Sequence, residues 1–304
     1  MPQRTTKDRT PQAEIAIIGG SGLYHMEGLT RLKEITVTTP FGKPSDSIML
    51  GSFEGLKIAF LARHGRGHHT LPSGINYRAN IHALKSLGVS RVFSVSAVGS
   101  MKENIRPGDF VLPDQFIDRT TQRLNTFFDQ GIVAHVAFAD PICPTLTSLL
   151  HKASQGLSVI VHRPGTYLCI EGPQFSTRAE SLLYRKWGAD IIGMTNIPEA
   201  KLAREAELCY ATLALVTDYD CWHETEEAVS VGAILDIMHT NVETAKQVLH
   251  DALKLAKNLG PCSCQTTLEH AIITPLIRMS PTLRKRYHVL LQRQLSNILK
   301  QKKR

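Results

Sequence analysis

The stretch at residues 210–216, YATLALV, constrains the fold of this chain more than any other. A nearly unbroken apolar run of this length is typical of a parallel strand that is buried on both faces. Asp218 and Asp220 follow, where the strand leaves the core. Because side chains at i and i+2 of a strand share a face, both carboxylates can point to one place. In an open α/β sheet, ligands bind beyond the carboxyl ends of the strands. The alternative is that the two aspartates belong to an acidic turn or a helix cap.

Other apolar runs alternate with segments of helical periodicity, which favours a single α/β domain. Strands are expected at 15–18, 48–50, 58–62, 91–96, 110–112, 167–170 and 190–194. Helices are expected at residues 76–87, 177–187, 198–208 and 230–260. The second begins with a capping box at 177–180, and the third begins with Pro198 in its first turn. Residues 127–144 are expected to be irregular.

The two ends of the chain differ from its body. Residues 1–12 are polar and lack the apolar segment of a signal peptide, so we expect a disordered tail there and the folded domain at 13–275. Residues 276–304 are expected to form a basic amphipathic helix capped by Ser280. Nine of the 35 Lys and Arg residues lie in that segment, without an acidic residue, so the body is nearly neutral and its charge does not indicate nucleic acid binding. The helix is expected to pack on protein, and a membrane surface or RNA is the alternative.

The cysteine content favours a reduced, cytoplasmic protein. Six cysteines in 304 residues do not make a disulfide scaffold, and no apolar run approaches the ~18 residues of a membrane span. Cys262 and Cys264 form a C-x-C pair, but zinc sites usually contain C-x₂₋₄-C and a second pair, so no metal is expected. The remaining cysteines are expected to be reduced core residues: Cys143, Cys169, Cys209 and Cys221.

Two loops that follow strands have the composition of anion sites. Residues 19–22, GGSG, offer backbone N–H groups and the Ser21 hydroxyl, although the spacing fits neither the dinucleotide nor the Walker pattern and a plain turn is the alternative. Residues 63–69, RHGRGHH, combine two arginines with three histidines, and the arginine fork matches a phosphate group. A solvated basic loop and a histidine metal cluster are the alternatives for the second loop.

Nine motifs, in order between residues 14 and 274, carry a resemblance to a known family. They are IIGGSGL (17–23), TPFGKPSD (39–46), ARHGR (62–66), NYRAN (76–80), PGD (107–109), DQFIDRT (114–120), EGPQFSTRAE (171–180), MT (194–195) and TDYDCW (217–222). Together they resemble the 5′-methylthioadenosine phosphorylases, within the trimeric purine nucleoside phosphorylase family. The C-x-C pair also resembles one in archaeal and bacterial members, whereas the segment after residue 274 matches nothing in the family.

The resemblance implies a mixed central sheet flanked by helices, with an extra C-terminal helix, and a role for each site residue. Phosphate would be held by Ser21, Arg63, His64, Ser96, Ala97 and Thr195. The nucleoside would contact Phe175, Ser176, Met194, Asp218, Asp220, Val231 and Ile234, with His135 reaching the 5′ pocket of a neighbouring subunit. The partners implied are a small-molecule nucleoside, phosphate and further copies of the chain, as a trimer or a dimer of trimers, with no nucleic acid and no membrane.

The implied reaction is phosphorolysis of 5′-methylthioadenosine to adenine and 5-methylthioribose 1-phosphate. Phosphate attacks C1′ through an oxocarbenium-like transition state while the purine leaves. Asp218 is the expected general acid, because a carboxyl in an apolar pocket beside a second carboxylate has a raised pKa. No metal or organic cofactor is expected. The first alternative is a phosphorylase acting on adenosine or 6-oxopurine nucleosides, and the second is a non-catalytic protein that binds nucleosides or RNA.

Overall fold

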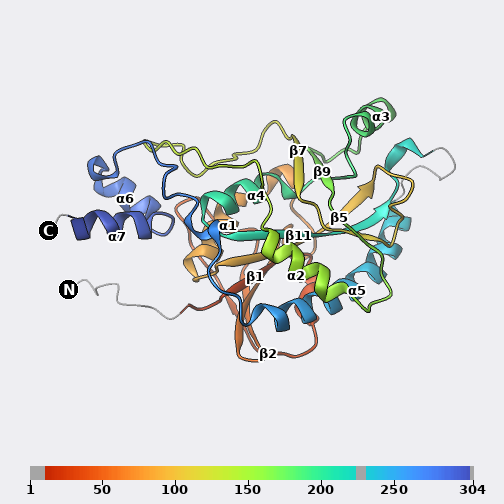
Figure 1. Cartoon of the computed structure of the whole chain (residues 1–304), viewed down its shortest axis with the longest axis horizontal. Helices are drawn as coiled ribbons and strands as arrows, with labels where there is room; N and C mark the ends of the chain where they lie inside the picture. The colour runs from red at the N-terminus through yellow and green to blue at the C-terminus, as the bar shows by residue number, and fades with distance from the viewer. Residues whose placement is uncertain (1–10, 224–230, 302–304) are drawn as a thin grey trace.

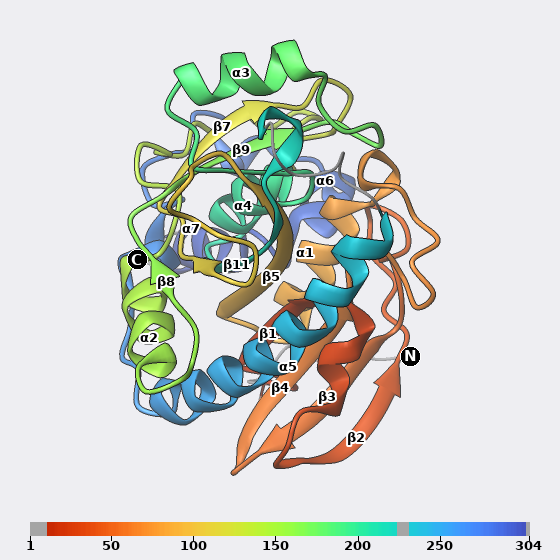
Figure 2. The same ribbon diagram turned by 90° about the vertical axis from the view of Figure 1, so that its right-hand side faces the viewer.

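One mixed sheet organises the part of the chain that the computed structural model describes, residues 11–223 and 231–301 (Figure 1, Figure 2). Its strands are β1 (Ile15–Gly19), β2 (Leu29–Ile35), β3 (Ile48–Phe53), β4 (Leu56–Ala62), β5 (Arg91–Ser100), β6 (Phe110–Val111), β7 (Gln115–Arg119), β8 (Val161–His162), β9 (Thr166–Ile170), β10 (Ile191–Gly193) and β11 (Cys209–Asp218). The α-helices are α1 (Tyr77–Ser86), α2 (Pro144–Ser154), α3 (Arg178–Lys186), α4 (Asn196–Glu205), α5 (Val231–Ala256), α6 (Pro281–Tyr287) and α7 (Gln292–Gln301).

The middle of the sheet is parallel. β1 lies between β4 and β5, and β11 pairs with β5 along nearly its whole length. The strand order is β2-β3-β4-β1-β5-β10-β9-β7, with β11 joined to β5 and, through β6, to β8. Because β10 runs antiparallel to β5, the sheet is mixed. Every residue of β1 and all but the last of β11 are buried, which explains their continuous apolar sequences.

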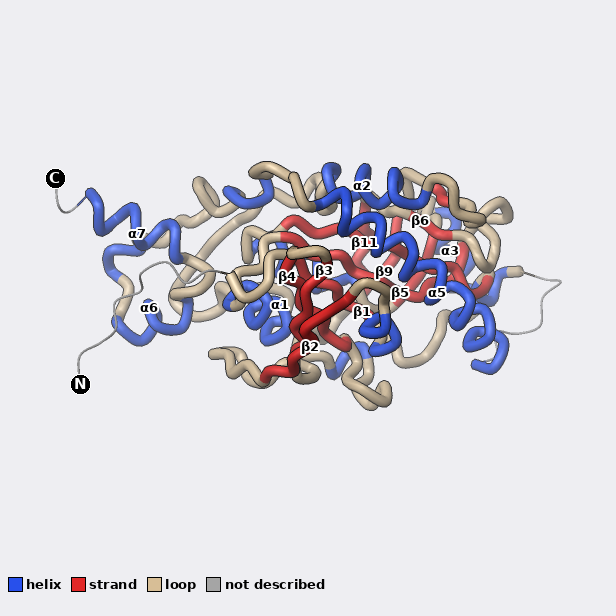
Figure 3. The backbone as a smooth tube through the Cα atoms, turned by 90° about the horizontal axis from the view of Figure 1, so that it is seen from below, coloured by secondary structure: helices blue, strands red, loops and turns tan. Residues whose placement is uncertain are grey.

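Helices cover both faces of this sheet. α2 and α5 pack on each other and on β11, while α4 packs on α1 and on β11. Figure 3 shows α2 and α5 running side by side over the strands. One large hydrophobic cluster runs through these layers, so the polar strand ends are held by a rigid core.

Most of the expected elements are confirmed. The strand expected at 210–216 is the centre of β11, the capping box of Thr177 and Glu180 starts α3, and Asn76 caps α1 by accepting from the Ala79 N–H. The sequence did not predict β2, an edge strand whose residues are mostly exposed, or α2, which begins where the irregular stretch ends. Ser230, the expected cap of α5, lies outside the described residues.

The single C-terminal helix that the sequence predicts is wrong, because the structure has two helices, α6 and α7, with a turn over 288–291. Tyr287, at the end of α6, and Leu290 and Leu291, in the turn, are buried together in the main core. Ser280 caps α6 as expected. The expectation that this segment packs on protein is therefore confirmed.

Of the tail expected at 1–12, residues 1–10 fall outside the described part, and the Gln12 N–H donates to the Leu87 carbonyl at 2.8 Å. Among the described helices, none combines the length and the apolar composition that crossing a bilayer requires.

Candidate active site

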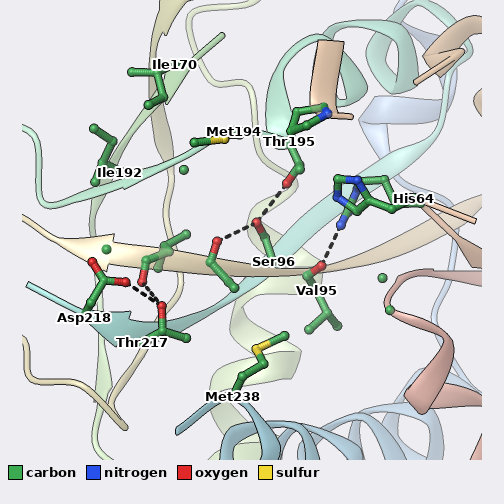
Figure 4. A pocket seen from close by; sticks show the side chains of 18 of the residues that line it. His64, Val95, Ser96, Ile170, Ile192, Met194, Thr195, Thr217, Asp218 and Met238 are labelled. Atoms are coloured by element: carbon green, nitrogen blue, oxygen red, sulfur yellow. Dashed lines mark hydrogen bonds between the residues drawn. The ribbon is translucent and has the colours of Figure 1, made fainter. Parts of the chain in front are cut away.

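A cavity of about 320 Å³ lies where the ends of several strands meet. Residues from β5, β10 and β11 and from the segments after β4 and β10 line it. Figure 4 shows Asp218 and Thr217 at one end, His64 at the other, and Ser96 with Thr195 between them. The predicted site residues that line the cavity are Arg63, His64, Ser96, Ala97, Phe175, Met194, Thr195, Asp218 and Asp220.

The two carboxylates reach the cavity from different local structures. Asp218 is the last residue of β11, whereas Asp220 begins a 3₁₀ helix with φ at +55°, so the simple i, i+2 strand relation is wrong. The Asp220 N–H donates to Asp218 Oδ1 at 2.8 Å, and the Thr217 hydroxyl donates to Oδ2 at 2.7 Å. A β-carbon at Gly99 would lie 2.8 Å from Asp218 Oδ1, so the neighbouring strand needs a glycine there. The Asp218 carboxylate is thus held in one orientation.

The pKa of the Asp220 carboxyl is raised. Burial is the largest cause, the hydrogen bond from Ser181 at 2.5 Å opposes it, and the charge of Asp218 raises the pKa of Asp220 further. A carboxyl group with a raised pKa therefore lies in the cavity lining beside Asp218.

Arg63 is more constrained than the sequence suggests. Its guanidinium forms four hydrogen bonds, two with Glu199 (2.7 and 2.8 Å), one with Val95 O (2.8 Å) and one with the Ser94 hydroxyl (2.6 Å). Both members of the Arg63–Glu199 pair are buried. Burial alone would lower the pKa of Arg63, but Glu199 keeps this pKa above its usual range. Of the five guanidinium N–H groups, one remains for a ligand within the described surroundings.

His64 is neutral and fixed by its neighbours. Nδ1 lies 2.8 Å from the Thr70 carbonyl, so this nitrogen carries the hydrogen and Nε2 is the free one. The ring stacks on His68 with centroids 4.2 Å apart, and burial lowers the pKa of His64 to about 4. The sequence pointed to the basic loop, and the structure adds that His68 and His64 act as one stacked pair.

Hydroxyl groups form the floor between the two ends of the cavity. Ser96 and Thr195 lie 2.9 Å apart by their oxygens, and Ser96 also lies 3.3 Å from the Tyr167 hydroxyl. Ala97, which follows Ser96 in β5, is exposed toward this space. A tetrahedral oxyanion placed here meets hydroxyl and N–H donors rather than carboxylates.

The apolar wall of the cavity is formed by Met194, Ile170 and Ile192 on one side and Met238 on the other (Figure 4). Phe175 also lines it and is 53% exposed, which leaves its ring available to a flat ligand. Ser176, beside it, has a buried hydroxyl without a hydrogen-bond partner among the described residues.

Five predicted residues are not placed in this cavity, and Ser176, which adjoins the cavity-lining Phe175 in sequence, is one of them. Ser21 lies in the 3₁₀ helix Ser21–His25, next to the cavity-lining Gly20 but not itself in the lining. His135 is exposed, and its N–H donates to the Ala271 carbonyl. Val231 and Ile234 are in α5, but their side chains lie outside the described part.

The sequence did not reveal two buried residues that hold the site together, Glu199 and Arg123. Arg123 donates to the Met194 and Ile197 carbonyls (2.6 Å each) and to Glu171 (2.8 Å), which joins the ends of β9 and β10. Its signal in the sequence was weak, because a lone arginine in an irregular stretch is usually solvated. Glu199 had no signal beyond its place near the start of α4.

Comparison with known proteins places the chain among related sequences and structures. The Phosphorylase superfamily profile matches residues 14–254. The S-methyl-5′-thioadenosine phosphorylase of Koribacter versatilis is 57% identical over 263 residues, covering 86% of this chain and 90% of that protein. A crystal structure of methylthioadenosine phosphorylase from an antarctic soil metagenomic library has a TM-score of 0.89 and 52% identity, covering 92% and 99% of the two chains.

A more distant structure was solved with a nucleoside bound. It is a variant of adenosine/methylthioadenosine phosphorylase from Schistosoma mansoni in complex with methylthioadenosine. It has a TM-score of 0.76 and 37% identity, covering 82% of this chain and 93% of that one. The mixed α/β architecture predicted from the sequence is the one these proteins share.

Proposed function

This chain belongs to the phosphorylase superfamily, and within it to the S-methyl-5′-thioadenosine phosphorylases, and we propose on that basis that it cleaves 5′-methylthioadenosine with phosphate. The products are adenine and 5-methylthioribose 1-phosphate, which makes the enzyme a pentosyltransferase of purine and methionine salvage. A purine nucleoside phosphorylase acting on adenosine or 6-oxopurine nucleosides is the second candidate, because the same cavity accommodates a nucleoside with a 5′-hydroxyl.

The observation that carries the proposal is the polarity of the cavity. The His64 imidazole occupies one end, with the Ser96 and Thr195 hydroxyls next to it on the floor. Two carboxyl groups occupy the other end, and an apolar wall with Met194 lies between the ends. A phosphate, a ribose and a purine require these environments in that order. Met194 is the residue we place under the ribose, and Phe175 the one we place against the base.

Phosphate is held in this proposal by Ser96, Thr195, Ala97 and the remaining N–H of Arg63, with Ser21 reaching it from the loop after β1. His64 presents Nε2, which accepts a hydrogen bond from a protonated phosphate oxygen, because the low pKa of His64 keeps its ring neutral at neutral pH. A phosphate oxygen then forms a bond to C1′ while the bond from C1′ to N9 breaks, and the electron pair passes to the purine.

The leaving purine gathers negative charge, which a proton at N7 neutralises. Asp218 is our candidate for this general acid, a contribution of about 10²–10⁴ in rate. Asp220 lies beside it with a raised pKa and is our candidate for the contact to the exocyclic amine. We propose that catalysis needs no metal and no organic cofactor, since phosphate itself is the nucleophile and the proton comes from the protein.

Preference for adenine over a 6-oxopurine rests on Ser176 and the two aspartates. A 6-oxopurine carries a hydrogen at N1 and an acceptor at O6, for which a carboxylate at 176 and an amide at 218 would be better suited. Val231 and Ile234 are proposed to line an apolar 5′ pocket that suits the methylthio group.

We propose that the chain works as a homotrimer, or a dimer of trimers, in the cytoplasm, with no nucleic acid or membrane partner. The exposed position of His135 supports a role at the 5′ pocket of a neighbouring subunit. Light scattering coupled to size exclusion tests the assembly, and a monomer with full activity would contradict it. We also propose residues 13–275 as the catalytic domain, with 276–304 added to it.

One assay tests the function. Release of free base is measured with and without phosphate on 5′-methylthioadenosine, adenosine and inosine. We expect release that depends on phosphate and is most efficient with 5′-methylthioadenosine. Faster turnover of inosine would favour the second candidate, and the absence of phosphate-dependent release from all three would reject both.

A further inference from the structure

Four cysteines that lie far apart in the sequence converge at the amino-terminal end of β11. Cys209 is the first residue of β11, Cys143 immediately precedes α2, and Cys262 and Cys264 follow α5. Their four sulfur atoms all lie within 4.8 Å of one another. Three of the side chains are buried and Cys262 is half-buried. The second cysteine pair that the sequence did not show is therefore supplied by the fold.

The spacing of the sulfurs fits metal ligands. Cys143 Sγ and Cys262 Sγ are 3.7 Å apart. A disulfide would need about 2.0 Å between them, whereas a tetrahedral zinc site with ~2.3 Å bonds separates its sulfurs by about 3.8 Å. Four sulfur ligands in a tetrahedron are characteristic of zinc or iron, and zinc is the ion that structural sites of this kind most often hold. We propose that Cys143, Cys209, Cys262 and Cys264 bind one zinc ion in a structural site.

The surroundings can accommodate the charge of such a site. Binding releases up to four thiol protons, and four thiolates with Zn²⁺ carry a net charge of −2. The Leu146 N–H, at the start of α2, donates to the Cys143 sulfur, and the helix dipole favours negative charge there. Arg91, which is paired with Cys209 across the sheet, bonds the Leu259 and Gly260 carbonyls just before the C-x-C pair.

The site would connect three parts of the scaffold and take no part in the reaction. It joins the segment before α2, the start of β11 and the loop after α5, which are otherwise linked through the packing of α2 and α5. Asp218 lies at the opposite end of β11, a ten-residue strand that spans roughly 30 Å. The inference is therefore independent of the proposed activity.

The test begins with the full-length protein, purified in a non-thiol reductant without chelator. Inductively coupled plasma mass spectrometry measures its metal content, and intact mass with and without alkylation counts free thiols under denaturing conditions. We expect one zinc per chain and six free thiols once the protein is denatured with a chelator. Protein with no bound zinc would overturn the proposal, whether the four thiols are free or joined in two disulfides.

Substitution assigns the ligands. Cys262→Ser should reduce the zinc content to background, whereas Cys221→Ser, outside the cluster, should leave one zinc per chain. Because loss of the ion can itself impair the folding of Cys262→Ser, the wild-type protein reconstituted with Co²⁺ gives a second measurement. Thiolate-to-cobalt charge transfer and the strong visible bands of tetrahedral cobalt are expected, and their absence, or zinc retained by Cys262→Ser, would overturn the assignment.

Discussion

The two ends of β11 have opposite chemistry. At Asp218, carboxyl, hydroxyl and imidazole groups surround a cavity and keep part of their hydrogen-bonding capacity for a ligand. At Cys209, four thiols face one another in a buried cluster between α2 and the loop after α5. Between the two ends, the strand is buried on both faces. The same rigid element thus holds a reactive edge at one end and a packed, structural edge at the other.

This difference predicts whether a substitution should change turnover or the free energy of unfolding. At the carboxyl edge, the groups are fixed by bonds to one another, such as Thr217 to Asp218, and not by the core alone. Changes there should alter turnover at a small cost in stability. Changes in the scaffold should alter the free energy of unfolding and leave turnover of the folded enzyme unchanged. The predictions below test that separation, from the largest expected effect to the smallest.

Removal of Ser280–Arg304 should have the largest effect, and it should be on stability alone. Tyr287, Leu290 and Leu291 are buried, and burying each side chain stabilises the fold by roughly 1.5–3 kcal/mol. We expect a lower melting temperature or aggregation, measured by calorimetry and light scattering. A soluble truncated protein with an unchanged melting temperature would show that the segment is independent of the body.

A pair of point variants refines that test. Tyr287→Ala should cost about 3–5 kcal/mol, the usual cost of deleting a buried aromatic side chain. Lys285→Ala, in the same helix but exposed, should change the free energy of unfolding by less than about 0.5 kcal/mol.

Glu199→Gln should change both stability and phosphate binding, because Glu199 belongs to the scaffold and also holds Arg63 at the cavity. It leaves the buried Arg63 charge without its partner, which costs about 3–5 kcal/mol. It also frees the guanidinium to turn, so the KM for phosphate should rise. Glu243→Gln, which removes an exposed pair with Lys246, is the control and should cost at most about 1 kcal/mol. A Glu199→Gln protein with wild-type stability would contradict the role of this pair.

Acid should destabilise the protein through His82, a scaffold residue. Burial lowers the pKa of His82 from 6.5 to about 4, and neither ring nitrogen has a partner among the described residues. The unfolded chain therefore binds a proton that the folded chain does not, so stability is complete above pH 6.5 and is lost as the pH falls toward 4. The loss from His82 is on the order of 3 kcal/mol.

Urea unfolding at pH 7.5, 6 and 5 measures this dependence. His82→Leu should flatten the decline, whereas His270→Gln, at an exposed position, should leave it as in the wild type. If the stability of the wild type and of His82→Leu declines equally, the acid sensitivity belongs to another group. His64 is an example, because burial also lowers the pKa of His64 to about 4.

The smallest effect expected is a change of specificity. Ser176→Glu combined with Asp218→Asn should move the ratio of kcat/KM for inosine over 5′-methylthioadenosine upward by about tenfold or more, since Glu accepts from N1–H and Asn donates to O6. Asp220→Asn should lower activity without that gain. A ratio that stays unchanged in the double variant would show that these positions do not read the 6-substituent.

Much of the fold was readable from the sequence because its central strands are long, apolar and ended by glycine or polar residues. β11 and β1 are examples, and the capping box of α3 is another. β2 was not predictable, because an exposed edge strand has no buried apolar face, so its sequence lacks the alternation of apolar and polar residues that marks a strand. The division of the C-terminal helix into two helices was also not predictable, because no Pro or Gly marks the turn at 288–291.

The site was predictable where function depends on a local motif and unpredictable where it depends on tertiary contacts. Asp218, Asp220, His64 and Ser96 follow strands in recognisable loops or strand ends. Glu199 is 136 residues from Arg63, and no local pattern joins them. Cys143 and Cys209 are hidden for the same reason: only the sheet brings them beside the C-x-C pair.

The most direct test of the central claim compares one substitution at each end of β11. Steady-state kinetics with 5′-methylthioadenosine and a thermal melt are recorded for Asp218→Asn and for Cys143→Ser. We predict that Asp218→Asn lowers kcat by ~100-fold or more with a stability change of at most about 1 kcal/mol. Cys143→Ser should lower the melting temperature and retain kcat in the folded protein. An Asp218→Asn enzyme that melts earlier but turns over normally would contradict the account, because Asp218 would then only cap a turn.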